Sequence, residues 1–125
     1  MKSARDTEAA ILDRLYEIVM ARRDERPEGS YVVQLLDAGW AAMAAKLREE
    51  SEELVIAARD ESDEAFAHEV ADLLFHVWVM MASRELPPAA VYAELSRRFG
   101  IGGLEEKASR TAAAVEGKGE IDAAG

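Results

Sequence analysis

Apolar residues recur every three or four positions along most of the chain, and no stretch alternates apolar and polar residues for the length of a β-strand. Pro27 and Gly29 interrupt this pattern early, and Gly100 ends it late. Ser62 follows a short acidic connection, where it can cap a helix. The pattern predicts helices at residues 7–26, 40–59, 63–84 and 88–99, with a helical or irregular piece at 31–36. The predicted fold class is all-α, with four to five helices.

The chain divides into one predicted domain and a tail. Its 125 residues are enough to bury one hydrophobic core. Residues 101–125 consist mostly of Gly, Ala, Glu and Lys and have few large apolar side chains. We therefore expect a helical domain at residues 1–100 and a C-terminal tail at 101–125 that is mobile unless a partner or substrate orders it.

An apolar seam runs along the helix predicted at residues 40–59, and one acidic residue lies within it. The apolar positions recur at alternating steps of three and four residues: Trp40, Met43, Leu47, Leu54 and Ala57. Glu50 occupies a position in this seam, with Lys46 one turn before it and Glu53 one turn after it. A carboxylate in such a seam costs free energy unless it is paired or bound to a cation.

The helix predicted at residues 63–84 is apolar on nearly all sides. Within residues 70–82 the only polar side chains are Asp72 and His76, so we expect neighbouring elements to enclose this stretch. Glu69, Asp72 and His76 follow the i, i+3, i+7 spacing of one helix face. Their polar groups are therefore expected to face an internal site.

Two predicted helices thus each carry a pair of carboxylates one turn apart, Glu50 with Glu53 and Glu69 with Asp72. The short connection between these helices makes them antiparallel neighbours, which brings the four carboxylates together. A divalent cation removes their mutual repulsion, and a set of oxygen ligands suits Mg²⁺ or Mn²⁺. We therefore predict a metal site at these four residues.

Other polar and aromatic residues fit simpler roles. His76, taken by itself, is typical of a hydrogen-bonded core histidine, and His68 is expected to be exposed. Glu-rich helices usually present a solvated face, and we expect this of Glu49, Glu52, Glu61 and Glu64. Packing in the core or in an interface is expected of Trp40, Trp78, Met80 and Met81.

Composition narrows the class of protein. Acidic residues outnumber basic ones by 25 to 15, and the formal charge of −10 disfavours binding to nucleic acid. The absence of cysteine excludes disulfides and thiolate metal sites and fits a reducing compartment. The first residues lack the apolar core of a signal peptide, and no stretch has about 18 uninterrupted apolar residues. We expect a cytoplasmic protein that binds neither nucleic acid nor a membrane.

The carboxylate pairs are part of a longer motif. Lys46-x-x-Glu49-Glu50-x-x-Glu53, followed by Glu69-x-x-Asp72-Leu73-Leu74-x-His76, resembles the signature of the phosphoribosyl-ATP pyrophosphohydrolases of histidine biosynthesis. The resemblance extends from about Leu15 to Arg110 and includes the segments Pro27-Glu28-Gly29-Ser30-Tyr31 and 103–110. The bare carboxylate pairs are shared with the wider group of MazG-type nucleotide pyrophosphohydrolases.

The resemblance implies an all-α, MazG-like fold that forms a helical-bundle homodimer. It also implies hydrolysis of phosphoribosyl-ATP to phosphoribosyl-AMP and pyrophosphate, with Mg²⁺ as cofactor and Mn²⁺ as a possible substitute. The implied metal ligands are Glu50, Glu53, Glu69 and Asp72. Glu49 and Glu50 are the implied catalytic residues, and Glu49 would be a further ligand or the group that orients water. The substrate-binding candidates are Lys46, Ser30, Tyr31, His76, Lys107 and Arg110.

Two alternatives stay open. A MazG-type housecleaning pyrophosphohydrolase, acting on ordinary or modified nucleoside triphosphates, would carry the same carboxylate pairs. An acidic helical interaction module without enzymatic activity would have a similar charge. A di-iron carboxylate bundle fits poorly, because such a bundle uses Glu-x-x-His pairs and the sequence has none.

Overall fold

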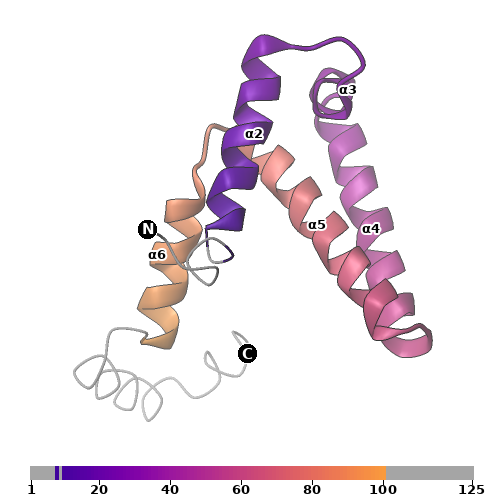
Figure 1. The fold of residues 1–125 in the computed structure, drawn as a ribbon. Helices are drawn as coiled ribbons and strands as arrows, with labels where there is room; N and C mark the ends of the chain where they lie inside the picture. The colour runs from indigo at the N-terminus through magenta and orange to yellow at the C-terminus, as the bar shows by residue number, and fades with distance from the viewer. Residues whose placement is uncertain (1–7, 9, 101–125) are drawn as a thin grey trace. The chain divides into compact units, whose positions relative to one another are not determined.

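The computed structural model describes residue 8 and residues 10–100, and all the regular structure in them is helical. Figure 1 shows the helices in chain order: α2 (Ile11–Glu25), α3 (Tyr31–Ala38), α4 (Trp40–Asp60), α5 (Asp63–Ser83) and α6 (Pro88–Phe99). The all-α prediction is therefore confirmed, and the segment expected to be helical or irregular after Ser30 is a helix.

The chain divides into two units, residues 1–88 and residues 89–125. The first unit contains α2 to α5, and the second contains α6 from Ala89 onward. In α6, the Glu94 carboxylate accepts hydrogen bonds from both Arg97 and Arg98, and these bonds lower the pKa of Glu94 to about 2. The tail predicted at residues 101–125 lies outside the described residues.

Helix boundaries follow the capping residues in the sequence. The Ser62 hydroxyl accepts a hydrogen bond from the backbone N–H of Ala65 at 3.1 Å, as predicted for an N-cap. Ser30 does the same for α3, because its hydroxyl accepts from the N–H of Val33 at 3.4 Å. Gly39 separates α3 from α4 with a φ of 92°, a conformation that residues with a Cβ rarely adopt.

The centre of the first unit is the pair of helices α4 and α5, which run antiparallel and are joined by a short turn (Figure 1). α5 also packs against α2, and α3 contacts α2, α4 and α5. The side chains with the least exposure come from these facing surfaces, and Val19, Ala57 and Val79 are each at most 1% exposed. Burial of these apolar groups is the main contribution to the stability of the unit.

Polar contacts of Trp78 and Arg23 fix α5 and the residues after it against α2. The indole Nε1 of Trp78 donates a 2.8 Å hydrogen bond to the carbonyl of Leu12. Arg23 donates to the carbonyl of Ala82 at 3.3 Å and pairs with Glu85 at 3.1 Å. The guanidinium therefore satisfies a carbonyl of the last turn of α5, where a positive charge also complements the helix dipole.

Not all the apolar residues predicted to be packed are covered within the described chain. Trp78 is 4% exposed and Met81 is buried, whereas Trp40 is 67% exposed. Trp40 is the first residue of α4 and is not covered within the described chain, so its packing in an interface stays a prediction. Several large side chains around the α4–α5 turn are also exposed: Val55, Ile56 and Phe66.

Among the described helices, α5 has the length and apolar composition that would suffice to cross a membrane. Core helices of soluble proteins meet the same criterion. α5 carries Glu69, Asp72 and His76 along its length and packs against α2 and α4, and its buried residues lie in its second half. Only 28% of its apolar window is buried within the described chain, so the enclosure of this helix predicted from the sequence is partial here.

Candidate functional site

Three carboxylates from two helices meet between α4 and α5. Glu50 and Glu53 lie one turn apart on α4, and Glu69 lies in the first half of α5. Each of the three offers an oxygen within 4.8 Å of the oxygens offered by the other two. Three anionic groups at this spacing repel one another unless they share a proton or a cation.

Glu50 is the buried member of this group, with 5% of its surface exposed. Its Oε1 lies 3.5 Å from the ammonium of Lys46, one turn earlier on α4. Its Oε2 is buried and receives no hydrogen bond. Within residues 10–100, Oε2 of Glu69 is the other buried side-chain oxygen that receives no hydrogen bond. A buried carboxylate oxygen without a donor is costly. A cation between α4 and α5 would satisfy both oxygens, so the donor set fits a divalent metal ion.

The pKa of Glu53 reflects the crowding of these carboxylates. It is raised above the ordinary value of 4.5, first by the charge of Glu50, then by partial loss of water and by the charge of Glu69. Glu53 is itself exposed, so neighbouring negative charge affects its pKa more than burial does. Glu53 therefore gains a proton more readily than an isolated glutamate, because its neighbours are negatively charged.

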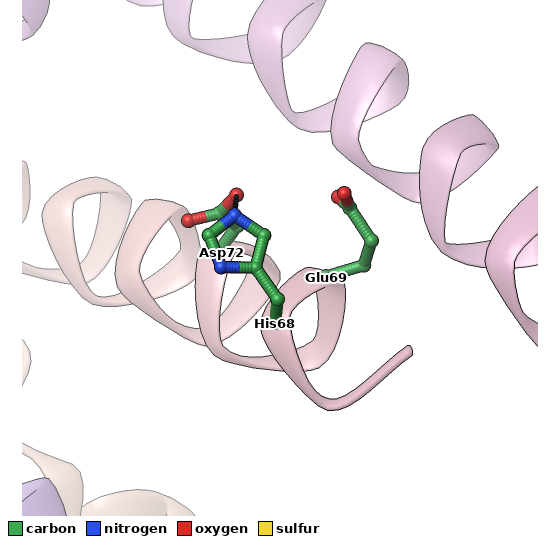
Figure 2. A group of neighbouring side chains, drawn as sticks. All are labelled: His68, Glu69 and Asp72. Carbon is green, nitrogen blue, oxygen red and sulfur yellow. Dashed lines mark ion pairs between the residues drawn. The ribbon is translucent and has the colours of Figure 1, made fainter. Parts of the chain in front are cut away.

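Asp72 belongs to a second group, which shares Glu69 with the first. His68, Glu69 and Asp72 offer ligand atoms within 4.8 Å of one another. Nε2 of His68 lies 3.3 Å from Oδ2 of Asp72. Figure 2 shows the imidazole and the Asp72 carboxylate together, while the Glu69 carboxylate points toward the neighbouring helix. The four predicted ligands thus form two overlapping groups joined by Glu69.

Lys46 provides the positive charge next to the carboxylates. Its ammonium lies 3.6 Å from Oε1 of Glu49 and 3.5 Å from Oε1 of Glu50. The pKa of Lys46 is raised, chiefly by the negative charge that Tyr31 carries when its phenol ionises; partial burial opposes this effect, and Glu49 and Glu50 add to it. Lys46 therefore remains a cation at neutral pH, with about a third of its side chain accessible to a ligand.

Tyr31 and His76 form a hydrogen-bonded pair beside this lysine. Nδ1 of His76 lies 2.7 Å from the carbonyl of Asp72, and Nε2 lies 3.1 Å from the hydroxyl of Tyr31. Because a carbonyl can only accept, Nδ1 carries the proton, and Nε2 of the neutral ring accepts from the tyrosine. Phe75 stacks on Tyr31 with ring centroids 6.0 Å apart. Both nitrogens of the buried His76 are therefore in use, as expected of a core histidine.

The remaining predicted site residues differ in burial and in their contacts. Ser30 is buried and caps α3, so its hydroxyl is already engaged. Glu49 is exposed and contacts Lys46. The other glutamates predicted to be solvated are exposed, as expected: Glu52, Glu61 and Glu64. Lys107 and Arg110 lie outside the described residues.

One neighbour of the carboxylates was not among the predicted site residues. His68 was expected to be exposed, and it is, but it also contacts Asp72. The signal was present in the sequence, because His68 and Asp72 are four residues apart and such residues are neighbours on a helix.

Comparisons with known proteins point to one family. The family profile described as phosphoribosyl-ATP pyrophosphohydrolase matches residues 12–99. The phosphoribosyl-ATP pyrophosphatase of Rhodopirellula baltica is 50% identical over 105 residues, which cover 81% of this chain and 87% of that protein. The protein of the same name from Parvibaculum lavamentivorans is 48% identical, and the aligned residues cover 82% of this chain and 94% of that protein. The one from Trichlorobacter lovleyi is 43% identical, and the aligned residues cover 80% of this chain and 93% of that protein.

Proposed function

This chain belongs to the phosphoribosyl-ATP pyrophosphohydrolase family, and on that premise we propose that it hydrolyses phosphoribosyl-ATP with Mg²⁺ as its cofactor. The products are phosphoribosyl-AMP and pyrophosphate, so the reaction is a step of histidine biosynthesis. Family membership supports the hydrolysis of a pyrophosphate bond. The observation that carries the metal requirement is the pair of buried oxygens without donors, Oε2 of Glu50 and Oε2 of Glu69.

The proposed metal ligands are those predicted from the sequence: Glu50, Glu53, Glu69 and Asp72. Three of them meet between α4 and α5, and Asp72 adjoins them through Glu69. The chemistry that Mg²⁺ supplies when bound is electrostatic, since it screens the negative polyphosphate and polarises the bond to be broken. Mn²⁺ prefers similar oxygen ligands and is a possible substitute.

Lys46 and Glu49 complete the proposed site on the α4 side. Lys46 holds a compact positive charge next to Glu50, which suits it to bind a phosphate of the substrate. Glu49 is exposed, one residue from Glu50, and contacts Lys46. We assign it the role of orienting the attacking water or of adding a further carboxylate to the metal ligands.

Tyr31 and His76 have a positioning role in this proposal. The His76 ring is held by the Asp72 carbonyl and in turn holds the Tyr31 hydroxyl in a hydrogen bond. Tyr31 is therefore fixed beside Lys46 while 42% of its surface stays exposed. A fixed phenol at the edge of the site can contact the substrate while the histidine remains buried.

We also propose that the protein is a cytoplasmic homodimer. Three large apolar side chains near the α4–α5 turn are exposed: Val55, Ile56 and Phe66. Exposed apolar groups in one place are typical of a surface that a partner covers. A second copy of the chain is the simplest partner, because symmetric pairs are the commonest assemblies of small soluble proteins. The partner in this arrangement would cover apolar residues close to the carboxylates of α4 and α5.

A comparison of substrates tests the proposed activity. Purified protein with saturating Mg²⁺ is given phosphoribosyl-ATP, ATP, GTP or dUTP, and pyrophosphate release is measured. We expect kcat/KM for phosphoribosyl-ATP to exceed that for the common triphosphates by at least about 100-fold, or about 2.7 kcal/mol. Equal or faster hydrolysis of the common triphosphates would identify a housecleaning enzyme, and no hydrolysis of any of them would favour an interaction module.

A further inference from the structure

Tyr31 carries a partly exposed aromatic ring that the fold holds in one orientation. It is the first residue of α3, and 42% of its surface is exposed. Its hydroxyl lies 3.1 Å from Nε2 of His76, and its ring stacks on Phe75 with 6.0 Å between centroids and 17° between ring planes. Phe75 in turn meets the ring of His76 edge-on, with centroids 5.1 Å apart. Three rings from α3 and α5 therefore support one another, and Tyr31 is the most exposed of them.

This ring adjoins groups of the candidate site on both α4 and α5. The charge of the ionised Tyr31 phenol is the largest influence on the pKa of Lys46, so the phenol lies close to the ammonium. On the α5 side, Nδ1 of His76 lies 2.7 Å from the carbonyl of Asp72. A nucleotide whose phosphates meet Lys46 and a cation on the carboxylates can therefore place its base against Tyr31.

An exposed aromatic ring that is held in place is suited to stack on a flat base. Bases stack on aromatic side chains because every base has a face of π electrons. Phe75 already lies on one face of the Tyr31 ring, so the other face is the one left for a ligand. The contacts with Phe75 and His76 already restrict the ring, which lowers the entropic cost of binding a ligand to it.

The base of the proposed substrate differs in charge from the base of ATP. In phosphoribosyl-ATP the second ribose is attached to N1 of the adenine. An adenine alkylated at N1 is a much stronger base than adenine itself, so it carries a positive charge at neutral pH. A cation over the face of a phenol ring is attracted by the π electrons, whereas a neutral purine gains stacking alone. A tyrosine ring therefore binds the alkylated purine more tightly than the purine of ATP.

Resting on the proposed function, we propose that the Tyr31 ring stacks on the purine of the substrate and makes the site prefer an N1-substituted, cationic adenine to the adenine of ATP. Phe75 and His76 are positioning residues in this arrangement, because they act through their contacts with Tyr31. The phosphates of the nucleotide are joined through the first ribose at N9, on the opposite side of the purine from N1. The positive end of the base therefore points away from the phosphates that Lys46 binds.

Two uncleavable ligands that differ by one methyl group measure this preference. They are α,β-methylene-ATP and its N1-methyl derivative, each titrated calorimetrically into the full chain with saturating Mg²⁺. We expect the wild-type protein to bind the N1-methyl derivative at least about fivefold more tightly, as a cation–π contact of ordinary strength would give. In Tyr31→Leu the two affinities should differ by less than about twofold, because the ring is gone. Tyr31→Phe is the matched control, and it should keep the preference because it keeps the ring.

Turnover gives a second readout. Tyr31→Leu should raise KM for phosphoribosyl-ATP by about tenfold with kcat nearly unchanged, because a stacked purine is bound equally in the ground state and in the transition state. Tyr31→Phe should stay within about threefold of the wild-type KM, since base stacking does not need the hydroxyl. Mn²⁺ affinity, measured without nucleotide, should be the same in all three proteins.

Two results would overturn the assignment of Tyr31. One is equal affinity of the wild-type protein for the two ligands, or a preference that persists in Tyr31→Leu. The other is a shift of Tyr31→Leu toward monomer in sedimentation with unchanged ligand affinities, which would show that a second copy of the chain covers the ring.

Failure of this inference can be distinguished from failure of the proposed function. If the protein hydrolyses phosphoribosyl-ATP with Mg²⁺ but Tyr31→Leu keeps the wild-type KM and ligand preference, only the role of Tyr31 is wrong. If the wild-type protein neither binds the two ligands nor hydrolyses phosphoribosyl-ATP, the proposed function is wrong and the role of Tyr31 falls with it.

Discussion

The ammonium of Lys46 lies 3.5 Å from one oxygen of Glu50, while the other oxygen of the same carboxylate is buried without a donor. The two residues are one turn apart on α4, so this ion pair is a local contact of a single helix. It neutralises part of the Glu50 charge but leaves Oε2 without a partner in a group that also holds Glu53 and Glu69. A divalent cation is the group that would complete the set.

Replacing a metal ligand with its amide should abolish turnover without unfolding the protein. Asp72→Asn and Glu50→Gln each remove one negative charge from the crowded site, so the metal-free variants should be as stable as the wild-type protein or more stable. We expect kcat/KM to fall by more than about 100-fold, a loss of at least about 2.7 kcal/mol in transition-state stabilisation. Pyrophosphate release and thermal unfolding provide the two measurements.

Glu52→Gln is the matched control for these variants, because Glu52 is on the same helix but is exposed and is not among the potential ligands. Its rate should change by less than about tenfold, or about 1.4 kcal/mol. Wild-type activity in Asp72→Asn, or a loss in Glu52→Gln as large as in Glu50→Gln, would refute the ligand assignment.

The raised pKa of Glu53 predicts how pH changes the stability of the metal-free protein. A carboxyl group whose pKa in the folded state lies above its unfolded value favours folding while it is protonated. This contribution is present below the unfolded pKa, near 4.5, and is lost as pH rises through the folded pKa. Glu53→Gln should therefore raise Tm at pH 7 relative to Glu52→Gln, and the difference should shrink toward pH 4.

Divalent cation should reverse that order. Bound Mg²⁺ stabilises the folded protein by mass action, and it should do so more in the wild-type protein than in Glu53→Gln. Thermal unfolding at pH 7 with EDTA and with Mg²⁺ provides the comparison. If Glu53→Gln lowered Tm at pH 7 in EDTA, repulsion among the three carboxylates would not be the dominant interaction of this residue.

The proposed dimer predicts a concentration-dependent stability. Val55→Glu and Phe66→Glu place a charge on side chains that are exposed within one chain but covered in the dimer, so each should shift the protein toward monomer. Sedimentation at micromolar concentration measures the assembly. Trp78 is buried within the chain, so Trp78→Glu should impair folding at any concentration, by several kcal/mol. An active wild-type monomer under these conditions would contradict the proposal.

The last segment of the chain carries two basic residues suited to a phosphate, Lys107 and Arg110. We propose that they bind the 5′-phosphate of the phosphoribosyl group of the substrate. Truncation after Gly100 should then raise KM for phosphoribosyl-ATP by at least about tenfold while Mg²⁺ affinity and dimerisation stay unchanged. The double variant Lys107→Ala, Arg110→Ala should reproduce most of that rise. An unchanged kcat/KM in the truncated protein would remove the tail from the mechanism.

Local patterns predicted the helices well because each boundary depends on neighbouring residues. Ser62 caps α5, Pro88 begins α6 and Gly100 follows its last residue, as the sequence indicated. The exposure of Trp40 within one chain was not predicted, because helical spacing assigns a face but does not reveal where the partner helices end. Ser30 was assigned to substrate binding because it belongs to the motif shared with the family, and its capping of α3 was not predicted.

The candidate site was predictable as a set of residues but not as a geometry. Helical spacing placed Glu50 with Glu53 and Glu69 with Asp72, and the short turn brought α4 against α5. The division into two groups joined by Glu69 depends on side-chain rotamers and on the rotation of α5 against α4. The Tyr31 to His76 contact spans 45 residues, so no local pattern predicts it.

The need for a divalent cation is best measured as the dependence of turnover on Mg²⁺. Protein freed of metal with EDTA and then dialysed is given phosphoribosyl-ATP, and pyrophosphate release is followed while Mg²⁺ is added in steps. The account predicts no measurable turnover without the cation and a saturable recovery in the wild-type protein and in Glu52→Gln, but not in Glu50→Gln. Full turnover of phosphoribosyl-ATP in the presence of excess EDTA would contradict it.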